Sequence, residues 1–111
     1  MRILFVENHA VFADVVTKHL LGEHQVNVVS RMTDAWARLC EDVFDVVLVD
    51  YDLEDGKGDE LVGKIRRESL AIKVVAVSSH EAGNKALRAA GADAVCGKLE
   101  FEQIEDVLGS L

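Results

Sequence analysis

The sequence predicts a doubly wound α/β fold, in which a five-stranded parallel sheet is covered by five helices on its two faces. Short apolar runs alternate along the chain with longer segments whose apolar residues recur at helical spacing. The central apolar runs lack polar alternation, which is typical of parallel strands buried on both faces. The length of 111 residues suits one domain with one core, and we expect residues 1–111 to form a single domain without a separate output domain.

Five apolar runs are predicted as strands, because each is short and bounded by polar or helical segments. They are RILFV (2–6), QVNVV (25–29), DVVLV (45–49), IKVVAV (72–77) and ADAVC (92–96).

Five segments are predicted as helices from apolar residues at helical spacing. The predicted apolar positions are Val11, Phe12, Val15, Val16 and Leu20, then Ala35, Trp36, Leu39 and Val43, then Leu61, Val62 and Ile65, then the alanine-rich segment 81–90, and last Phe101, Ile104, Leu108 and Leu111. Trp36 and Phe101 are interpreted as core residues. Gly22 and Gly91 stand where helix C-caps are expected.

The alternation of strands and helices also predicts the order of the strands. Right-handed crossovers between parallel strands favour the order 2-1-3-4-5. Ligands of such folds bind beyond the carboxyl ends of the strands, at the switch point between strands 1 and 3. The first strand ends at Glu7 and Asn8 and the third at Asp50, so we expect these residues to share one crevice.

The composition argues against several classes of function. Twelve basic and 20 acidic residues give a net charge of −8, which disfavours binding to nucleic acid or an anionic membrane. No apolar run approaches the ~20 residues of a membrane span, and the run Ile3 to Val6 is too short for a signal peptide. Cys40 and Cys96 lie in apolar contexts without a disulfide or metal pattern, so both are predicted as reduced core thiols of a cytoplasmic protein.

The ends of the remaining strands add chemistry to this crevice. Strand 4 ends at Ser78 and Ser79, and strand 5 is followed at once by Gly97 and Lys98. Carboxylates with oxygen neighbours suit Mg²⁺, which is usually bound by one or two carboxylates and phosphate oxygens. A lysine and a hydroxyl beside the metal can hold further phosphoryl oxygens. The set therefore predicts phosphoryl transfer onto Asp50, in which positioning and charge neutralisation dominate.

Four motifs in this order resemble the receiver domain of response regulators in two-component signalling. They are ILFVENHAVF, VVLVDYDLEDGKGDEL, VVAVSS and GADAVCGKL, and the resemblance covers essentially the whole chain. It implies a phosphoacceptor signalling domain whose own chemistry is limited to forming and hydrolysing an aspartyl phosphate. The phosphoryl group would come from a histidine kinase or phosphotransfer protein, and output would occur by contact with a downstream protein.

The resemblance also implies a role for individual residues. Asp50 would be the phosphoacceptor, and Ser78 and Lys98 would bind the phosphoryl oxygens. Mg²⁺ would be bound by Asn8, Asp50 and the backbone carbonyl of Asp52, and by Glu7 through water. Asp52 and His80 fall at two positions that tune hydrolysis in the family. The implied docking surface for the phosphodonor consists of Val11, Phe12 and Val15, although burial in the core explains these three nearly as well.

Three departures from the family pattern leave a second function open. Asn8 stands where a second acid is usual, so Mg²⁺ should bind weakly. Leu99 replaces the proline that usually follows the lysine, and without proline a cis peptide is strongly disfavoured. Val95 replaces an aromatic switch residue. The alternative is therefore a degenerate receiver that serves as a phosphorylation-independent docking module.

Two other binding functions fit the residues after strand 1 poorly. A flavodoxin-like mononucleotide site needs a phosphate loop rich in glycine and hydroxyl groups, whereas ENHAVF is acidic there. A cobalamin site with His9 as ligand lacks the glycine-rich turn that it needs.

Overall fold

The computed structural model describes all 111 residues and contains a five-stranded parallel sheet. Its strands are β1 (Arg2–Val6), β2 (Gln25–Val29), β3 (Val46–Val49), β6 (Lys73–Ala76) and β7 (Ala94–Val95). The order across the sheet is β2-β1-β3-β6-β7, which is the predicted order 2-1-3-4-5. The register places Val6 of β1 opposite Val49 of β3, so the two strands end side by side. Glu7 and Asp50 therefore emerge together.

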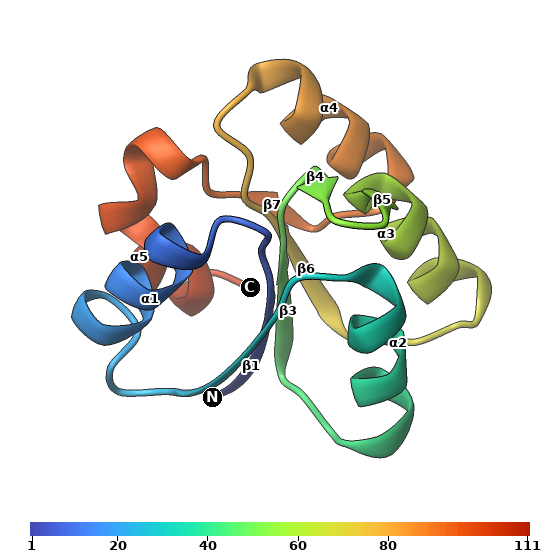
Figure 1. Cartoon of the computed structure of the whole chain (residues 1–111), viewed down its shortest axis with the longest axis horizontal. Helices are drawn as coiled ribbons and strands as arrows, with labels where there is room; N and C mark the ends of the chain where they lie inside the picture. The colour runs from blue at the N-terminus through green and yellow to red at the C-terminus, as the bar shows by residue number, and fades with distance from the viewer.

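Helices cover both faces of the sheet (Figure 1). They are α1 (Ala10–His19), α2 (Met32–Glu41), α3 (Gly58–Arg67), α4 (Glu81–Ala90), and a 3₁₀ turn, η1 (Lys98–Gln103), that continues into α5 (Ile104–Gly109). α1 and α5 lie on one face, whereas α2, α3 and α4 lie on the other. None of these helices has the length and apolar character that crossing a membrane requires.

Each face of the sheet has its own hydrophobic core. Ile3 and Phe5 pack toward α1 and α5, whereas Leu4 and Val6 pack toward α2 and α3. Because successive side chains of a strand point to opposite faces, a strand covered on both sides must be apolar at every position. This explains the unbroken apolar runs of β1 and β3.

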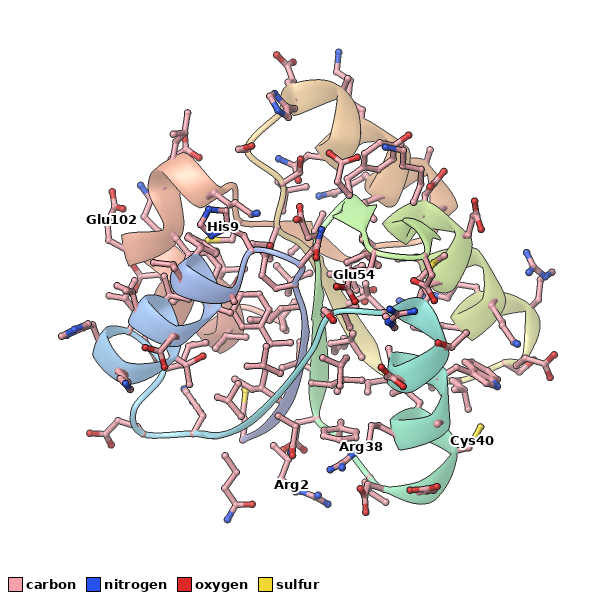
Figure 2. All side chains as sticks on the ribbon, in the orientation of Figure 1. Arg2, His9, Arg38, Cys40, Glu54 and Glu102 are labelled. Carbon is pink, nitrogen blue, oxygen red and sulfur yellow. The ribbon has the colours of Figure 1, made fainter.

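A short antiparallel hairpin follows Asp50 and was not predicted. It pairs β4 (Asp52–Leu53) with β5 (Gly56–Lys57). The Asp55 carboxylate accepts hydrogen bonds from the backbone N–H groups of Met32 (2.7 Å) and Thr33 (3.1 Å), and thereby caps α2. Glu54 reaches toward the start of the same helix (Figure 2) and pairs with Arg31 at 3.0 Å. The acidic segment after β3 is therefore fastened to α2.

The structure corrects some of the sequence predictions. Gly91 is the C-cap of α4 with φ +127°, but α1 ends at His19 with Leu20 as its C-cap, so Gly22 is not a C-cap. Cys96 is buried as predicted, whereas Cys40 is exposed on the outer side of α2 (Figure 2). The last helix begins as a 3₁₀ turn.

Two predicted core aromatics differ in burial. Phe101 is buried, but Trp36 is only partly buried and packs against the edge of the core with the Lys64 ammonium 4.5 Å from its ring centre.

Candidate functional site

Two carboxylates and one ammonium group meet at the carboxyl ends of β1 and β3. Lys98 Nζ donates to Glu7 Oε2 at 2.9 Å and to Asp50 Oδ2 at 3.0 Å. Both acids are buried, with 1% of Glu7 and 6% of Asp50 exposed. Lys98 lies near the C-terminal end of the chain and is the first residue of η1. The structure thus brings together three of the predicted site residues by direct contacts.

The charges of this cluster do not balance, because two carboxylates share one ammonium group. Burial raises the pKa of Glu7 to about 7, against the opposing effect of hydrogen bonds from the His9 N–H and Lys98. The negative charge of Asp50 raises it further. Burial lowers the pKa of Lys98, but the bonds to Glu7 and Asp50 outweigh burial and leave it raised. The crevice therefore favours an additional positive charge, either a proton on Glu7 or a cation.

The other predicted residues line a cavity of about 280 Å³ beside Asp50 and Lys98. Asn8, Asp52, Ser78 and His80 all contribute to its wall. Ser78 is buried, and its Oγ accepts a hydrogen bond from the backbone N–H of His80 at 3.1 Å. The Asp52 carboxylate pairs with Lys57 across the hairpin, which holds the pKa of Asp52 below its usual range.

Asp50 is positioned by its backbone as well as by Lys98. Its N–H donates to the carbonyl of Val6 at 2.9 Å, which continues the β1–β3 ladder beyond the last strand residue. Its Oδ1 accepts from the N–H of Tyr51 at 2.8 Å. α3 begins directly against this strand end, and Gly58 makes the approach possible because a methyl group there would collide with the Asp50 carbonyl oxygen.

The site offers oxygen donors that suit Mg²⁺. Glu7 Oε1 is buried without any hydrogen-bond partner, as expected for an oxygen that faces a metal-bound water or carries a proton. Asn8 lies at the exposed rim of the same cavity. No group of three or more His, Cys, Asp or Glu side chains gathers at this site. The residues therefore fit Mg²⁺ only through a set of two carboxylates supplemented by neutral oxygens.

The three predicted docking residues divide between surface and core. Val11 and Val15 are exposed by 69% and 48%, so they do not belong to the buried face of α1. Neither residue lines the cavity. Phe12 is half-buried and packs edge-on against Phe101, with ring centres 5.3 Å apart. Its ring centre lies 5.0 Å from Lys98 Nζ. His9, at the start of α1 (Figure 2), caps this helix by accepting from the N–H of Phe12 at 3.1 Å.

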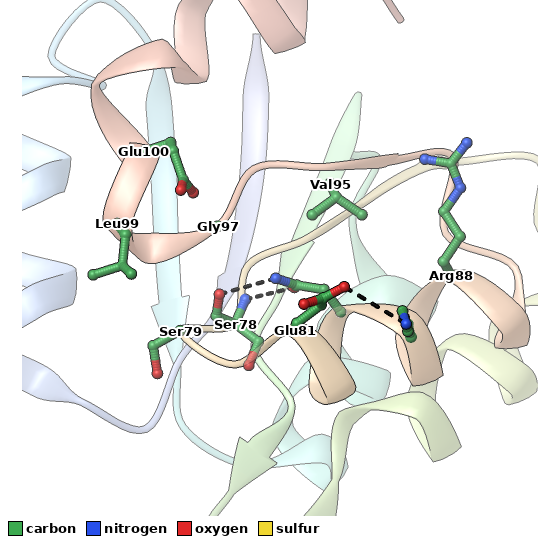
Figure 3. A pocket seen from close by; sticks show the side chains of 10 residues that line it. Ser78, Ser79, Glu81, Arg88, Val95, Gly97, Leu99 and Glu100 are labelled. Carbon is green, nitrogen blue, oxygen red and sulfur yellow. Dashed lines mark hydrogen bonds and ion pairs between the residues drawn. The ribbon is translucent and has the colours of Figure 1, made fainter.

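The segment around Lys98 carries the two departures noted in the sequence. The chain contains no cis peptide bond, so Lys98 precedes Leu99 through a trans peptide. Leu99 is exposed by 79%. Val95 is partly exposed in a groove between α4 and η1 (Figure 3).

Sequence reasoning missed one residue that contacts the site. Asn84 in the first turn of α4 forms two hydrogen bonds with the backbone of Ser78. A signal was present, because Gly83 and Asn84 are poor helix formers inside an alanine-rich helix.

Comparison with known proteins agrees with this geometry. Residues 3–99 match the family model of the response regulator receiver domain. No curated protein sequence matches the chain significantly. Among solved structures, the response regulator TrrA from Thermotoga maritima, in complex with Mg²⁺-BeF, superposes with a TM-score of 0.87. It is 19% identical, and the match covers 98% of this chain and 96% of that one.

Two further solved structures show the same fold. A CheY-like receiver domain protein from Methanospirillum hungatei has a TM-score of 0.83 and 24% identity, with 98% of this chain and 91% of that one covered. A two-component response regulator from Clostridium difficile has a TM-score of 0.86 and 17% identity, with 99% and 93% covered.

Proposed function

The chain belongs to the response regulator receiver family of two-component signalling, and we propose that it accepts a phosphoryl group on Asp50 from a histidine kinase or phosphotransfer protein. The observation that carries this proposal is the pairing of the buried Asp50 carboxylate with Lys98 at 3.0 Å, beside a cavity that Ser78 also lines. A carboxylate buried at a strand end is costly unless it has a partner or a task.

The transfer step follows from these groups. An Asp50 carboxylate oxygen attacks phosphorus, a P–O bond forms, and the P–N bond of the donor phosphohistidine breaks with its electron pair remaining on the ring nitrogen. Lys98 and the Ser78 hydroxyl then hold oxygens of the transferred group. Asn8, Asp50 and the Asp52 carbonyl would hold Mg²⁺ directly and Glu7 through water, and the ion would supply neutralisation of the charge that develops on these oxygens.

The phosphoryl group leaves by hydrolysis, when water attacks phosphorus and releases phosphate and the Asp50 carboxylate. The side chains of Asp52 and His80 line the cavity beside Asp50. We assign them the tuning of the hydrolysis rate. The Asp52 carboxylate is already paired with Lys57, so its effect on that water depends on this ion pair.

The donor would approach over the first turns of α1. Val11 and Val15 present apolar surface there, and Phe12 joins that surface to Lys98. A helix bundle carrying a phosphohistidine could bury this surface against its own apolar face. Output would follow by contact with a downstream protein.

Phosphorylation is tested by incubating the protein with Mg²⁺ and acetyl phosphate or phosphoramidate, and measuring the intact mass. We expect the addition of one phosphoryl group in the wild type and in the control variant Asp34→Asn, whose exposed carboxylate lies on α2. Asp50→Asn should remain unmodified. A wild-type protein that stays unmodified with every small donor and with its kinase would favour the degenerate docking module instead.

A further inference from the structure

One side chain of α4 forms hydrogen bonds with both the N–H and the carbonyl of Ser78. Asn84 Oδ1 accepts from the N–H of Ser78 at 2.9 Å, and Asn84 Nδ2 donates to the Ser78 carbonyl at 3.0 Å. Figure 3 shows both bonds reaching Ser78 from α4. The amide thus pairs with Ser78 as a neighbouring strand would, although β6 has ended at Ala76.

The start of α4 also packs directly on Ser78. A methyl group at Gly83 would lie 2.7 Å from Ser78 Oγ and 3.0 Å from the Cβ of Tyr51, so only glycine allows this approach. The Ser78 carbonyl accepts a further hydrogen bond from the N–H of Lys98 at 3.2 Å. Ser78 is therefore the point where α4 and the lysine segment are joined.

The bonds of Asn84 differ from ordinary helix capping. A capping side chain would accept from N–H groups in the first turn of its own helix, and His80, the N-cap of α4, makes no such bond. Asn84 instead bonds both backbone groups of Ser78, which lies two residues before the N-cap His80. It also lines, together with Ser78 and Val95, the groove of about 470 Å³ between α4 and η1.

We propose that Asn84 is a positioning residue for phosphoryl transfer. By fixing the backbone of Ser78 it orients the Ser78 hydroxyl toward the phosphoryl group on Asp50, and it ties any shift of Ser78 to a shift of α4. The inference rests on the proposed function, because it requires Ser78 to bind the phosphoryl group. Asn84 thereby couples the position of Ser78 to the groove between α4 and η1, in a chain that has Val95 at the aromatic switch position.

The test is a double-mutant cycle on the rate of phosphorylation. The maximal rate with acetyl phosphate and saturating Mg²⁺ is measured for the wild type, Asn84→Ala, Ser78→Ala and the double variant. Asn84→Ala should lower the rate about five- to tenfold in the wild-type background, which corresponds to one ordinary hydrogen-bonded contact. In the Ser78→Ala background the same substitution should change the rate less than about twofold, because Asn84 acts through the serine hydroxyl.

Two controls separate positioning from general destabilisation. Lys85→Ala removes an exposed neighbour on the same helix and should leave the rate unchanged. Asn84→Ser, which keeps a polar side chain too short to reach both backbone groups, replaces Asn84→Ala if that variant does not fold. In the wild type, the Ser78 amide should exchange slowly with solvent by NMR, and in Asn84→Ala it should exchange faster.

The outcomes distinguish this proposal from the proposed function. A phosphorylated wild type with equal effects of Asn84→Ala in both backgrounds, or with no effect, overturns the positioning role alone. Rapid exchange of the wild-type Ser78 amide also overturns it. A wild type that no donor phosphorylates overturns the proposed function, and the positioning role with it.

Discussion

Replacing Glu7 with glutamine should raise the free energy of unfolding of the metal-free protein at pH 8 by about 1–3 kcal/mol. The upper end of this range follows from the shift of the Glu7 pKa from 4.5 to about 7, since each pKa unit is worth about 1.4 kcal/mol. Glutamine resembles the protonated acid. Lys98 and the His9 N–H both donate to Oε2, which the amide oxygen can replace. The amide NH₂ takes the place of Oε1, which has no partner, and this unpaired donor offsets part of the gain.

The sign follows from the protons bound in each state. Below pH 4.5 Glu7 is protonated in both the folded and the unfolded protein, so its contribution to stability is fully present. Between pH 4.5 and about 7 the folded protein holds a proton that the unfolded chain has lost, so the free energy of unfolding falls as the pH rises. Above pH 7 this contribution is lost. The glutamine variant has no such proton and should lack this fall.

Urea unfolding in the presence of a chelator, followed by the fluorescence of Trp36, measures both pH profiles. Trp36 is the single tryptophan of the chain and packs at the edge of the core on α2. Glu102→Gln removes the same charge from an exposed position on η1 and should follow the wild type within about 0.5 kcal/mol. Parallel profiles for the wild type and Glu7→Gln from pH 4 to pH 8 would refute the reasoning.

Four further variants test other parts of the site. Asn8→Asp should tighten Mg²⁺ binding by adding a charged ligand, and it should lower metal-free stability by about 1 kcal/mol through repulsion with Asp50. Titration calorimetry measures the first effect and urea unfolding in chelator the second, and an unchanged Mg²⁺ affinity would remove Asn8 from the ligand set. Gly58→Ala should displace α3 from the end of β3, lowering stability by about 1–3 kcal/mol and slowing phosphorylation of Asp50. A variant as stable as the wild type would contradict the close contact between Gly58 and the Asp50 carbonyl oxygen. Phe12→Ala should lower stability by about 2–4 kcal/mol, because its ring packs against Phe101. Val11→Ser should leave stability within about 0.5 kcal/mol and slow transfer from a phosphohistidine donor, and a transfer rate equal to that of the wild type would exclude Val11 from docking.

The architecture could be predicted from the sequence because it depends on local patterns. The runs that became β1 and β3 are apolar at every position, which is how a strand covered on both faces must read. The handedness of crossovers then favoured the strand order that the structure has, which places Glu7 and Asp50 at the same edge. Local spacing alone does not decide which side of a helix is buried. The sequence therefore predicted Val11 and Cys40 to be less exposed than they are.

The sequence by itself determined the sheet, the strand ends and the residue types at the crevice. Only the tertiary structure decided how these residues pair. Lys98 bridges Glu7 and Asp50 because η1 carries it back across the sheet, and 48 residues separate it from Asp50 in the chain. Asn84 bonds Ser78 because Gly83 lets α4 approach the strand end. Hydrophobic periodicity records which face of a segment is buried, whereas hydrogen-bond partners depend on the distances between packed segments, which no single segment encodes.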